Sequence, residues 1–341
     1  MKKFLSFVVG FGVLFELSGS ITVLDNDFAD DAKEVSVFIR VADDLPKGLS
    51  RSQSREKARR LLDRISRMPQ LKRVSIQYYV DNDADTHFPI EVFAGLTNLS
   101  ELALSGSVER PILISSLSSM KDMPVKELDL KHVRIKEEGS FSCLKQLKRL
   151  KTDAPWMLGK VPVDLEGLSI ESVAVGSFVD LSRFTKLRSL ELHDFSCEGV
   201  LGVGKMSDLQ SLWLCGSFDF DFDDLKGCRK LSSVSLHGGY NWIGPRDFWA
   251  LSRFPLEYLK INSVPIQEIR GLEKCPLKDV VIHDCPVRDL ESICDLPYVE
   301  RLDVRGTCIR TTDKDMLKRR FPRLKIYECI ANSGDAITYY W

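Results

Sequence analysis

The sequence lacks an excess of charge of either sign. Its 48 lysine and arginine residues face 49 aspartate and glutamate residues, so the formal net charge is only −1. A protein that binds nucleic acid through the phosphate backbone usually carries a clear basic excess. The balanced charge therefore argues against a dedicated nucleic-acid binder.

The motifs that mark common enzyme and cofactor sites are also missing. The chain has no glycine-rich phosphate loop, no zinc-protease helix and no nucleophile elbow. The segment DNDAD at residues 81–85 starts like a calcium-binding loop, but Thr86 stands where such a loop needs glycine and Val92 where it needs glutamate. We interpret this segment as a turn, and we predict a non-enzymatic protein without a cofactor or a metal site.

Long hydrophobic runs are absent except at the N-terminus. There, Lys2 and Lys3 precede a twelve-residue apolar run at residues 4–15, and Ser18 and Ser20 follow. This order is typical of a secretory signal peptide, and the run is too short to span a bilayer as a stable helix. We predict a signal peptide at residues 1–20, a secreted or cell-envelope location and no stable membrane span. The alternative is a buried element of an N-terminal cap, which would make the protein a cytoplasmic adaptor.

The nine cysteines form an odd number, so at least one thiol has no disulfide partner within the chain. Cys275 and Cys294 come shortly before units of the repeated motif described next, and Cys285 falls in a small core position after one of them. These places favour mostly free, buried thiols. That prediction is in tension with export to an oxidising compartment, where disulfides usually form.

An apolar-x-x-apolar-x-apolar motif dominates the rest of the chain. It occurs seven times in a row between Leu165 and Val304, and all 21 of its diagnostic positions are apolar. The units follow one another at intervals of 22, 22, 22, 25, 21 and 22 residues and begin at Leu165, Leu187, Leu209, Leu231, Leu256, Leu277 and Val299. Units that contact only their neighbours stack into one elongated solenoid.

Irregular units continue the motif toward the N-terminus. They begin at Leu71, Leu99, Val125 and Leu147, which brings the expected number of repeat strands to about eleven. Residues 34–77 are expected to form a strand, a helix and a strand, which we interpret as a unit that caps the open end of the sheet. The basic residues of that helix are expected to be a solvated outer surface.

The C-terminal region predicts a second cap. Thr312 and Asp315 have the spacing of a capping box that opens a short helix, and a final strand is expected near Leu324 to Tyr327. We therefore assign residues 312–341 to a C-terminal cap and tail.

Two aromatic loops interrupt the regular repeats. The segment FDFDFDD at residues 218–224 is expected to bury its phenylalanines under the sheet. The insertion GGYNWIGPRDFW carries Tyr240, Trp242 and Trp249, which we expect to pack against the convex side of the solenoid.

The L-x-x-L-x-L unit, repeated every 22 residues or so, resembles that of leucine-rich-repeat proteins and is most similar to their short-repeat bacterial type. The resemblance covers residues 71–327. It implies an α/β solenoid with a curved parallel sheet and a short irregular or 3₁₀ return on the convex side. It also implies that the concave face binds a protein or peptide.

One family feature is missing from these repeats. The asparagine that the family places after the strand is replaced by other residues, namely Val133, Phe195, Ser217, Val264, Cys285 and Thr307. Backbone groups in the turn must then find other hydrogen-bond partners, and we expect local irregularity in the stack.

The concave surface can be derived from the strand pattern. Core residues alternate with residues on the open face, and equivalent positions on successive strands lie about 4.8 Å apart. Aromatic, imidazole and charged side chains then gather in one predicted patch, which comprises Glu191, His193, Trp213, Cys215, His237, Tyr258 and Lys260.

Three interpretations of the predicted patch stay open. It is a polar lining without a special task, or a partner-binding centre built on an exposed tryptophan and tyrosine ringed by polar groups, or a metal-binding or enzymatic site formed by His193, Cys215 and His237. We assign these residues to partner binding, with a protein or peptide of unknown identity as the partner.

Overall fold

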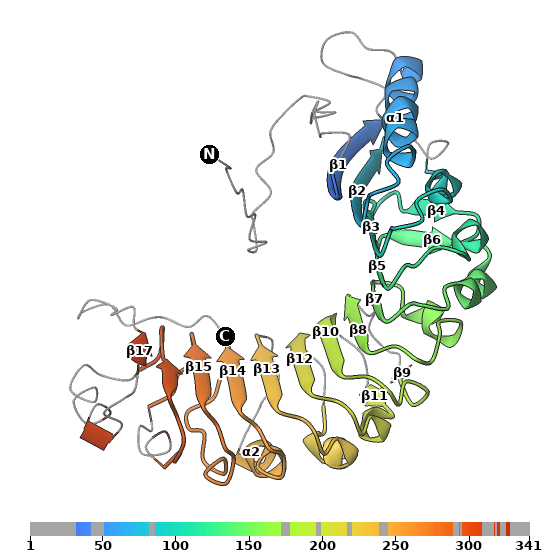
Figure 1. Ribbon diagram of the computed structural model, residues 1–341. Helices are drawn as coiled ribbons and strands as arrows, with labels where there is room; N and C mark the ends of the chain where they lie inside the picture. Colours follow the sequence, from blue (N-terminus) through green and yellow to red (C-terminus); the bar gives the residue numbers. More distant parts are fainter. Residues whose placement is uncertain are drawn as a thin grey trace.

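The computed structural model describes residues 32–41, 51–81, 86–171, 178–195, 199–216, 220–238, 245–288, 293, 295–308, 317, 319–320 and 325–327. These residues form an arc-shaped solenoid (Figure 1). Several predicted features lie outside the described residues: the signal peptide at 1–20, most of the aspartate-rich turn, Tyr240 and Trp242, the capping box at Thr312 and Asp315, and the tail from 328.

The described residues contain one sheet of thirteen strands, in which each strand pairs in parallel with its neighbours. The sheet lines the inner side of the arc (Figure 1). In spatial order the strands are β1 Glu34–Val41, β2 Arg73–Val80, β3 Glu101–Ser105, β5 Glu127–Lys131, β7 Arg149–Thr152, β8 Gly167–Glu171, β10 Ser189–Phe195, β12 Ser211–Gly216, β13 Ser233–His237, β14 Tyr258–Asn262, β15 Asp279–His283, β16 Arg301–Asp303 and β17 Lys325–Tyr327. The eleven expected repeat strands are β2 to β16 of this series, and β1 and β17 extend the sheet at its ends. The predicted curved parallel solenoid is confirmed.

The core follows directly from the repeated motif. In the unit of β10, the three apolar positions are Leu187, Leu190 and Leu192, and each is fully buried. Burying a leucine side chain contributes about 1.5–3 kcal/mol, so a stack of such units supports a long, thin molecule. The one polar residue in a core position, Thr152, is also buried, and its hydroxyl accepts a hydrogen bond from the Ala154 backbone N–H at 3.0 Å.

Short returns cover the outer side of the arc (Figure 1). They comprise the 3₁₀ helices η2 Ile90–Phe93, η3 Ser118–Met120, η4 Glu138–Cys143, η5 Pro155–Gly159, η6 Val203–Lys205 and η7 Phe222–Gly227, the α-helix α2 Pro245–Leu251, and the strand pairs β4 Ile112–Ile114 with β6 Val133–Ile135 and β9 Phe178–Asp180 with β11 Gly199–Leu201. Neighbouring returns approach very closely, because a Cβ added at Gly227 would lie only 1.8 Å from the carbonyl oxygen of Gly204. The predicted 3₁₀ character of the convex side is confirmed.

The longest helix, α1 Arg51–Ser66, packs against β1 near one end of the sheet. Ala58, Leu62 and Ile65 form its buried face. Its outer face is rich in exposed arginines. Arg59 and Arg60 both donate hydrogen bonds to Glu56 and lower the pKa of that carboxyl to about 2. No helix within the described ranges combines the length and the apolar character that a bilayer crossing requires.

The turns after the strands show how the chain manages without an asparagine ladder. The first turn residue takes a left-handed conformation in several repeats, with φ of 54° at Ser263 and 50° at Asp284. The backbone N–H of each then donates to a backbone carbonyl at or just after the strand of the next repeat, from Ser263 to His283 at 2.9 Å and from Asp284 to Arg305 at 3.0 Å. Backbone groups make the link in these two turns, whereas after β5 the N–H of His132 donates to the Asp153 carboxylate at 3.0 Å.

At the position where the family has asparagine, three described repeats carry small apolar side chains. Val133, Val264 and Cys285 occupy it and are buried. The expected irregularity is local: the register between β10 and β12 shifts after Leu192.

The two aromatic loops differ in their degree of burial. Phe222 is buried and Phe220 is partly buried against the core, as expected. Trp249 lies on the convex side as expected, with its indole near Gly271, but it packs only in part, because its side chain is 59% exposed. Phe248, beside it on the short helix α2, takes the fully buried position.

Candidate functional site

Alternate residues of each strand face the concave side, and the strand register aligns them in three rows. The first row holds residues at the strand starts, from Glu34 on β1 to Arg301 on β16. The middle row runs two residues further along each strand, from Ser36 to Asp303. The third row runs two further again, from Phe38 to His283.

Trp213, in the middle row on β12, is the centre of an aromatic and imidazole stack. Its ring lies 3.7 Å from the ring of His193 on β10 and 5.0 Å from that of His237 on β13, between ring centroids. His193 Nε2 is 3.3 Å from a carboxylate oxygen of Glu191. The structure therefore brings four of the seven predicted residues into one contiguous cluster.

His237 and Glu191 of this cluster differ in charge at neutral pH. Burial is the main cause that lowers the pKa of His237 to about 4, with smaller contributions from the positive charge of Lys260 and from His193 and His283. His237 is therefore a neutral imidazole at neutral pH. The hydrogen bond with His193 lowers the pKa of Glu191, so this carboxylate stays ionised.

Cys215 does not join the histidines in a coordination site. It lies in the third row between the strands of His193 and His237, but the indole of Trp213 contacts both imidazole rings. Burial raises the pKa of the Cys215 thiol, which keeps it protonated at neutral pH, whereas a zinc ligand must be a thiolate. Within the described residues, no three histidine, cysteine or acidic side chains are grouped so that they could hold one metal ion.

The last two predicted residues lie at the margin of the stack. Lys260 lies in the same row as Trp213 but two strands away, because Ser235 on β13 stands between them in the register. Tyr258 belongs to the first row instead, and the charges that act on its phenol are those of Asp279 and Arg301 on the following strands. The structure thus places Tyr258 on the same face, but with a different set of neighbours.

A groove that the sequence did not reveal crosses the other half of the concave face. It has a volume of about 710 Å³ and follows the first and middle rows from β1 to β10, where it ends at Glu191 beside the Trp213 stack. Its floor is formed by small middle-row residues, among them Ser36, Ser75 and Ala103. This run of small residues in one row is the signal that could have indicated the groove.

Ion pairs between strands form the walls of this groove. Arg73 lies between Glu34, at 2.9 Å, and Glu101, at 2.6 Å, and Arg149 pairs with Glu127 at 2.6 Å. These pairs link residues of the first row across adjacent strands, so most of the cationic groups in the groove are already neutralised.

A second ion cluster lies on the third-row side of the groove. Lys131 and Lys151 both bind Glu171, at 2.9 and 2.7 Å. Burial alone would raise the pKa of Glu171, but the hydrogen bonds from the two lysines outweigh it and lower the pKa to about 2. Asp129 is different, because burial raises its pKa and it makes no hydrogen bond or ion pair with any described residue.

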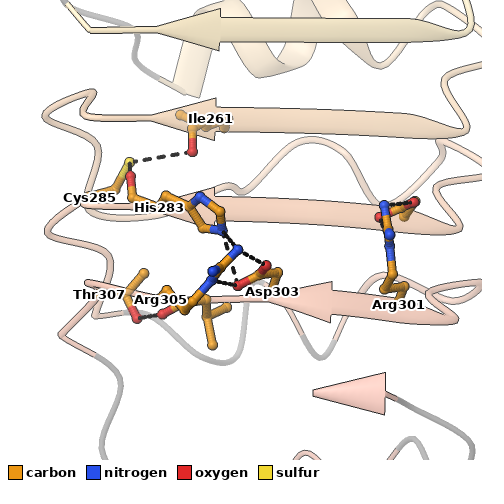
Figure 2. Close-up of polar contacts among 9 residues, drawn as sticks. Ile261, His283, Cys285, Arg301, Asp303, Arg305 and Thr307 are labelled. Carbon is orange, nitrogen blue, oxygen red and sulfur yellow. Dashed lines mark hydrogen bonds and ion pairs between the residues drawn. The ribbon is translucent and has the colours of Figure 1, made fainter. Parts of the chain in front are cut away.

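A third polar cluster lies on β15 and β16, near the other end of the sheet (Figure 2). Asp303 accepts hydrogen bonds from Arg305 Nε at 2.9 Å and Nη2 at 2.7 Å, and it lies 3.0 Å from His283 Nε2. These contacts satisfy a carboxylate that is only 8% exposed. The Cys285 thiol donates to the His283 carbonyl at 3.0 Å instead of facing this cluster, so we interpret the cluster as structural.

Comparisons with known proteins give a fold likeness. No family model and no curated protein sequence matches the chain. Among solved structures, the chain is similar to an internalin from Listeria monocytogenes, with 14% identity, a TM-score of 0.45, and coverage of 89% of this chain and 88% of that one. It is also similar to a leucine-rich-repeat protein from Leptospira interrogans, with 13% identity, a TM-score of 0.39, and coverage of 78% and 80%.

The chain's own geometry decides the fold, since the L-x-x-L-x-L positions fill the core behind a parallel sheet with 3₁₀ returns. The fold is a leucine-rich-repeat solenoid. Repeats of this kind present equivalent residues side by side along an extended concave surface. In this chain, the surface carries the groove in one half and the Trp213 stack in the other.

Proposed function

We propose that the protein is a non-enzymatic interaction module, exported from the cell, that binds a protein or peptide on the concave face around Trp213. The carrying observation is the half-buried indole held between two imidazole rings. Tryptophan dominates binding energy when it sits at the centre of a surface ringed by polar groups. Glu191, Cys215 and Lys260 provide such a ring here, and Tyr258 extends it into the first row.

The surroundings of Trp213 reduce the cost of binding. Its backbone is paired on both sides, with β10 and with β13, and its ring is in contact with His193 and His237. A partner therefore meets a side chain that has already lost most of its rotational freedom. Because His237 is neutral at neutral pH, covering it does not require burying a charge.

No observation favours the metal-binding or enzymatic alternative for this cluster. The protonated Cys215 and the indole between the imidazoles both act against a shared ion. We therefore retain partner binding as the proposed role of these residues, and we do not include nucleic acid among the proposed partners.

Export remains part of the proposal, with a cytoplasmic adaptor as its alternative. The six cysteines among the described residues carry free thiols, and Cys228, Cys275 and Cys285 are buried. Free thiols are common in reducing compartments, and burial also protects them elsewhere. N-terminal sequencing of the mature chain separates the two possibilities, because a retained Met1 would contradict cleavage and export through a signal peptide.

Site-specific photo-crosslinking in the producing cells tests the proposed binding face. A benzophenone amino acid at Ser235, next to Trp213 in the register, is expected to give a covalent adduct with one partner. The adduct should disappear when Trp213→Ala is added. The matched control carries the probe at Trp156, a convex residue that is 62% exposed. Adducts from the control position alone would mean that the concave face is not the binding surface.

A further inference from the structure

The groove across β1 to β10 has an excess of acidic groups. Five carboxylates line it, against three cationic groups, Arg73, Arg149 and Lys151, so its lining has a formal charge of −2. A groove of this charge attracts cationic ligands and repels anionic ones.

The cations in the groove are already engaged with carboxylates. Arg73 lies between Glu34 and Glu101, and Arg149 binds Glu127. Lys151 reaches across to Glu171, which lies outside the groove lining, instead of binding its row neighbour Asp129. The pairing therefore leaves one carboxylate of the groove unmatched.

That carboxylate is Asp129, in the middle row on β5. It has no hydrogen bond or ion pair with any described residue, and burial raises its pKa. A desolvated carboxylate without a partner is costly, and a cationic group brought to it recovers part of that cost. Lys151 and Lys131 act on Asp129 only through space, because both ammonium groups bind Glu171 directly, so Asp129 has no direct cationic partner among the described residues.

The space for such a group lies directly beside Asp129. Ala103 pairs with Asp129 in the register, and Ser75 pairs with Ala103. These small side chains form the floor of the groove and leave room for a long side chain to lie along the row.

We propose that the groove binds a lysine or arginine side chain of the protein partner, laid over Ser75 and Ala103 with its charge on Asp129. The inference rests on the proposed function, because it assigns the partner's chemistry on the same concave face. It adds a charged contact to the apolar contact expected at Trp213.

The register gives the spacing between the two contacts. Asp129 and Trp213 lie in the same row, separated by four strand steps through β7, β8 and β10. At about 4.8 Å per step this is about 19 Å, and an extended chain at about 3.3 Å per residue covers it in about six residues. The expected partner segment has a basic residue and an apolar residue about six positions apart.

A phage-displayed library of random twelve-residue peptides tests the proposal on the full-length protein. Wild-type protein is expected to enrich peptides with this spacing. Asp129→Asn should lose the basic residue from the selected sequences and keep the apolar one, whereas Trp213→Ala should do the reverse. Asp122→Asn, on an exposed convex turn, is the matched control and should select the same peptides as the wild type.

The selected peptide then provides a quantitative check. Replacing its basic residue with neutral citrulline, or introducing Asp129→Asn, is expected to weaken binding about tenfold in fluorescence anisotropy, and the two changes together should be no worse than either alone. Ala103→Leu, which fills the groove without changing its charge, should have a similar effect while the melting temperature shows that the protein is folded.

The outcomes separate the two proposals. If Asp129→Asn and the wild type select the same peptides, or if selection yields no basic residue, the groove inference is wrong while the role of Trp213 stands. If Trp213→Ala leaves the apolar preference of the selected peptides unchanged, the proposed binding around Trp213 is wrong. If no peptide is enriched at all, neither the groove nor the stack recognises linear segments, and both assignments are overturned for such partners.

Discussion

The two halves of the concave face are built on the same repeat but present different chemistry. From β1 to β10 the surface is hollow and ionic, with Arg73 and Arg149 held by carboxylates on neighbouring strands. From β12 to β14 the surface is filled by Trp213 and His237, and the imidazole of His237 is neutral at neutral pH. The first kind of surface favours selectivity through charge and the second favours affinity through apolar contact. One scaffold can therefore divide the two tasks between its halves.

The largest expected effect tests whether the halves differ only at the surface. Leu128 on β5 and Leu212 on β12 occupy the same core position and are both buried. Leu128→Ala and Leu212→Ala should each lower the free energy of unfolding by about 2–5 kcal/mol. Urea denaturation followed by circular dichroism measures this, with Ser235→Ala as a surface control. A much smaller loss in one half would mean that its core is less well packed.

The next effect concerns binding in the aromatic half. Trp213→Ala should weaken partner binding by about 2 kcal/mol or more, because it removes the central contact. Trp249→Ala removes an indole that is 59% exposed on the convex side and should leave the affinity unchanged. Isothermal titration with the cross-linked partner, once purified, gives both values. Equal losses from the two variants would remove the distinction between the faces.

Acid should weaken the ionic half in its own pH range. The pKa of Glu171 is lowered from 4.5 to about 2, so its ionised form stabilises the folded state above pH 4.5, and this contribution is lost as the pH falls toward 2. After allowance for screening, Glu171→Gln should remove about 1–2 kcal/mol of this acid-dependent stability. Denaturation curves between pH 5 and pH 2 measure it, and Glu109→Gln on an exposed loop should behave as the wild type does.

On acidification, the aromatic half should begin to lose stability at a higher pH than the ionic half does. The pKa of His237 is lowered from 6.5 to about 4, so the unfolded chain binds a proton between these values while the folded chain does not. Stability therefore decreases as the pH falls from 6.5 to 4, by about 1 kcal/mol after allowance for partial solvent access. His237→Gln should remove this decrease, and the exposed His87→Gln should keep it. A midpoint for His237 near 6.5 by NMR titration would contradict the stack geometry.

The smallest effect sharpens the role of the groove. Arg149 and its partner Glu127 are largely exposed, so Arg149→Gln should change the free energy of unfolding by less than about 1 kcal/mol. The same change makes the groove more negative and should strengthen the binding of the selected basic peptide. Weaker binding would indicate that Arg149 itself contacts the ligand.

The core and the strand order could be predicted from the sequence, because each apolar position of the motif is buried when the repeats stack. Leu165, Leu187 and Leu209 could only be buried together if their strands stacked in parallel. The pattern is redundant, so the irregular early units did not obscure it.

The candidate site was only partly predictable, because it depends on which side chains meet across strands. The rows correctly placed His193, Trp213 and His237 on adjacent strands, but periodicity could not show that the indole would lie between the imidazoles. The groove was missed because its floor consists of small side chains, and because Lys151 binds Glu171 and not Asp129. Rotamer choices of this kind are not encoded in spacing.

The residue-for-residue register of the sheet fixes the possible distances between contacts on the concave face. Contacts along one row can be separated only by whole strand steps of about 4.8 Å. A duplicated or deleted repeat between Asp129 and Trp213 would therefore change the length of partner segment that fits by about one and a half extended residues. Turns such as that between Ser263 and His283 are joined by backbone groups, but the turn after β5 uses the Asp153 carboxylate, so loss of the β7 repeat would also require a new acceptor for the His132 N–H. Partner length could thus be altered by gain or loss of whole repeats while the chemistry of both contacts is preserved.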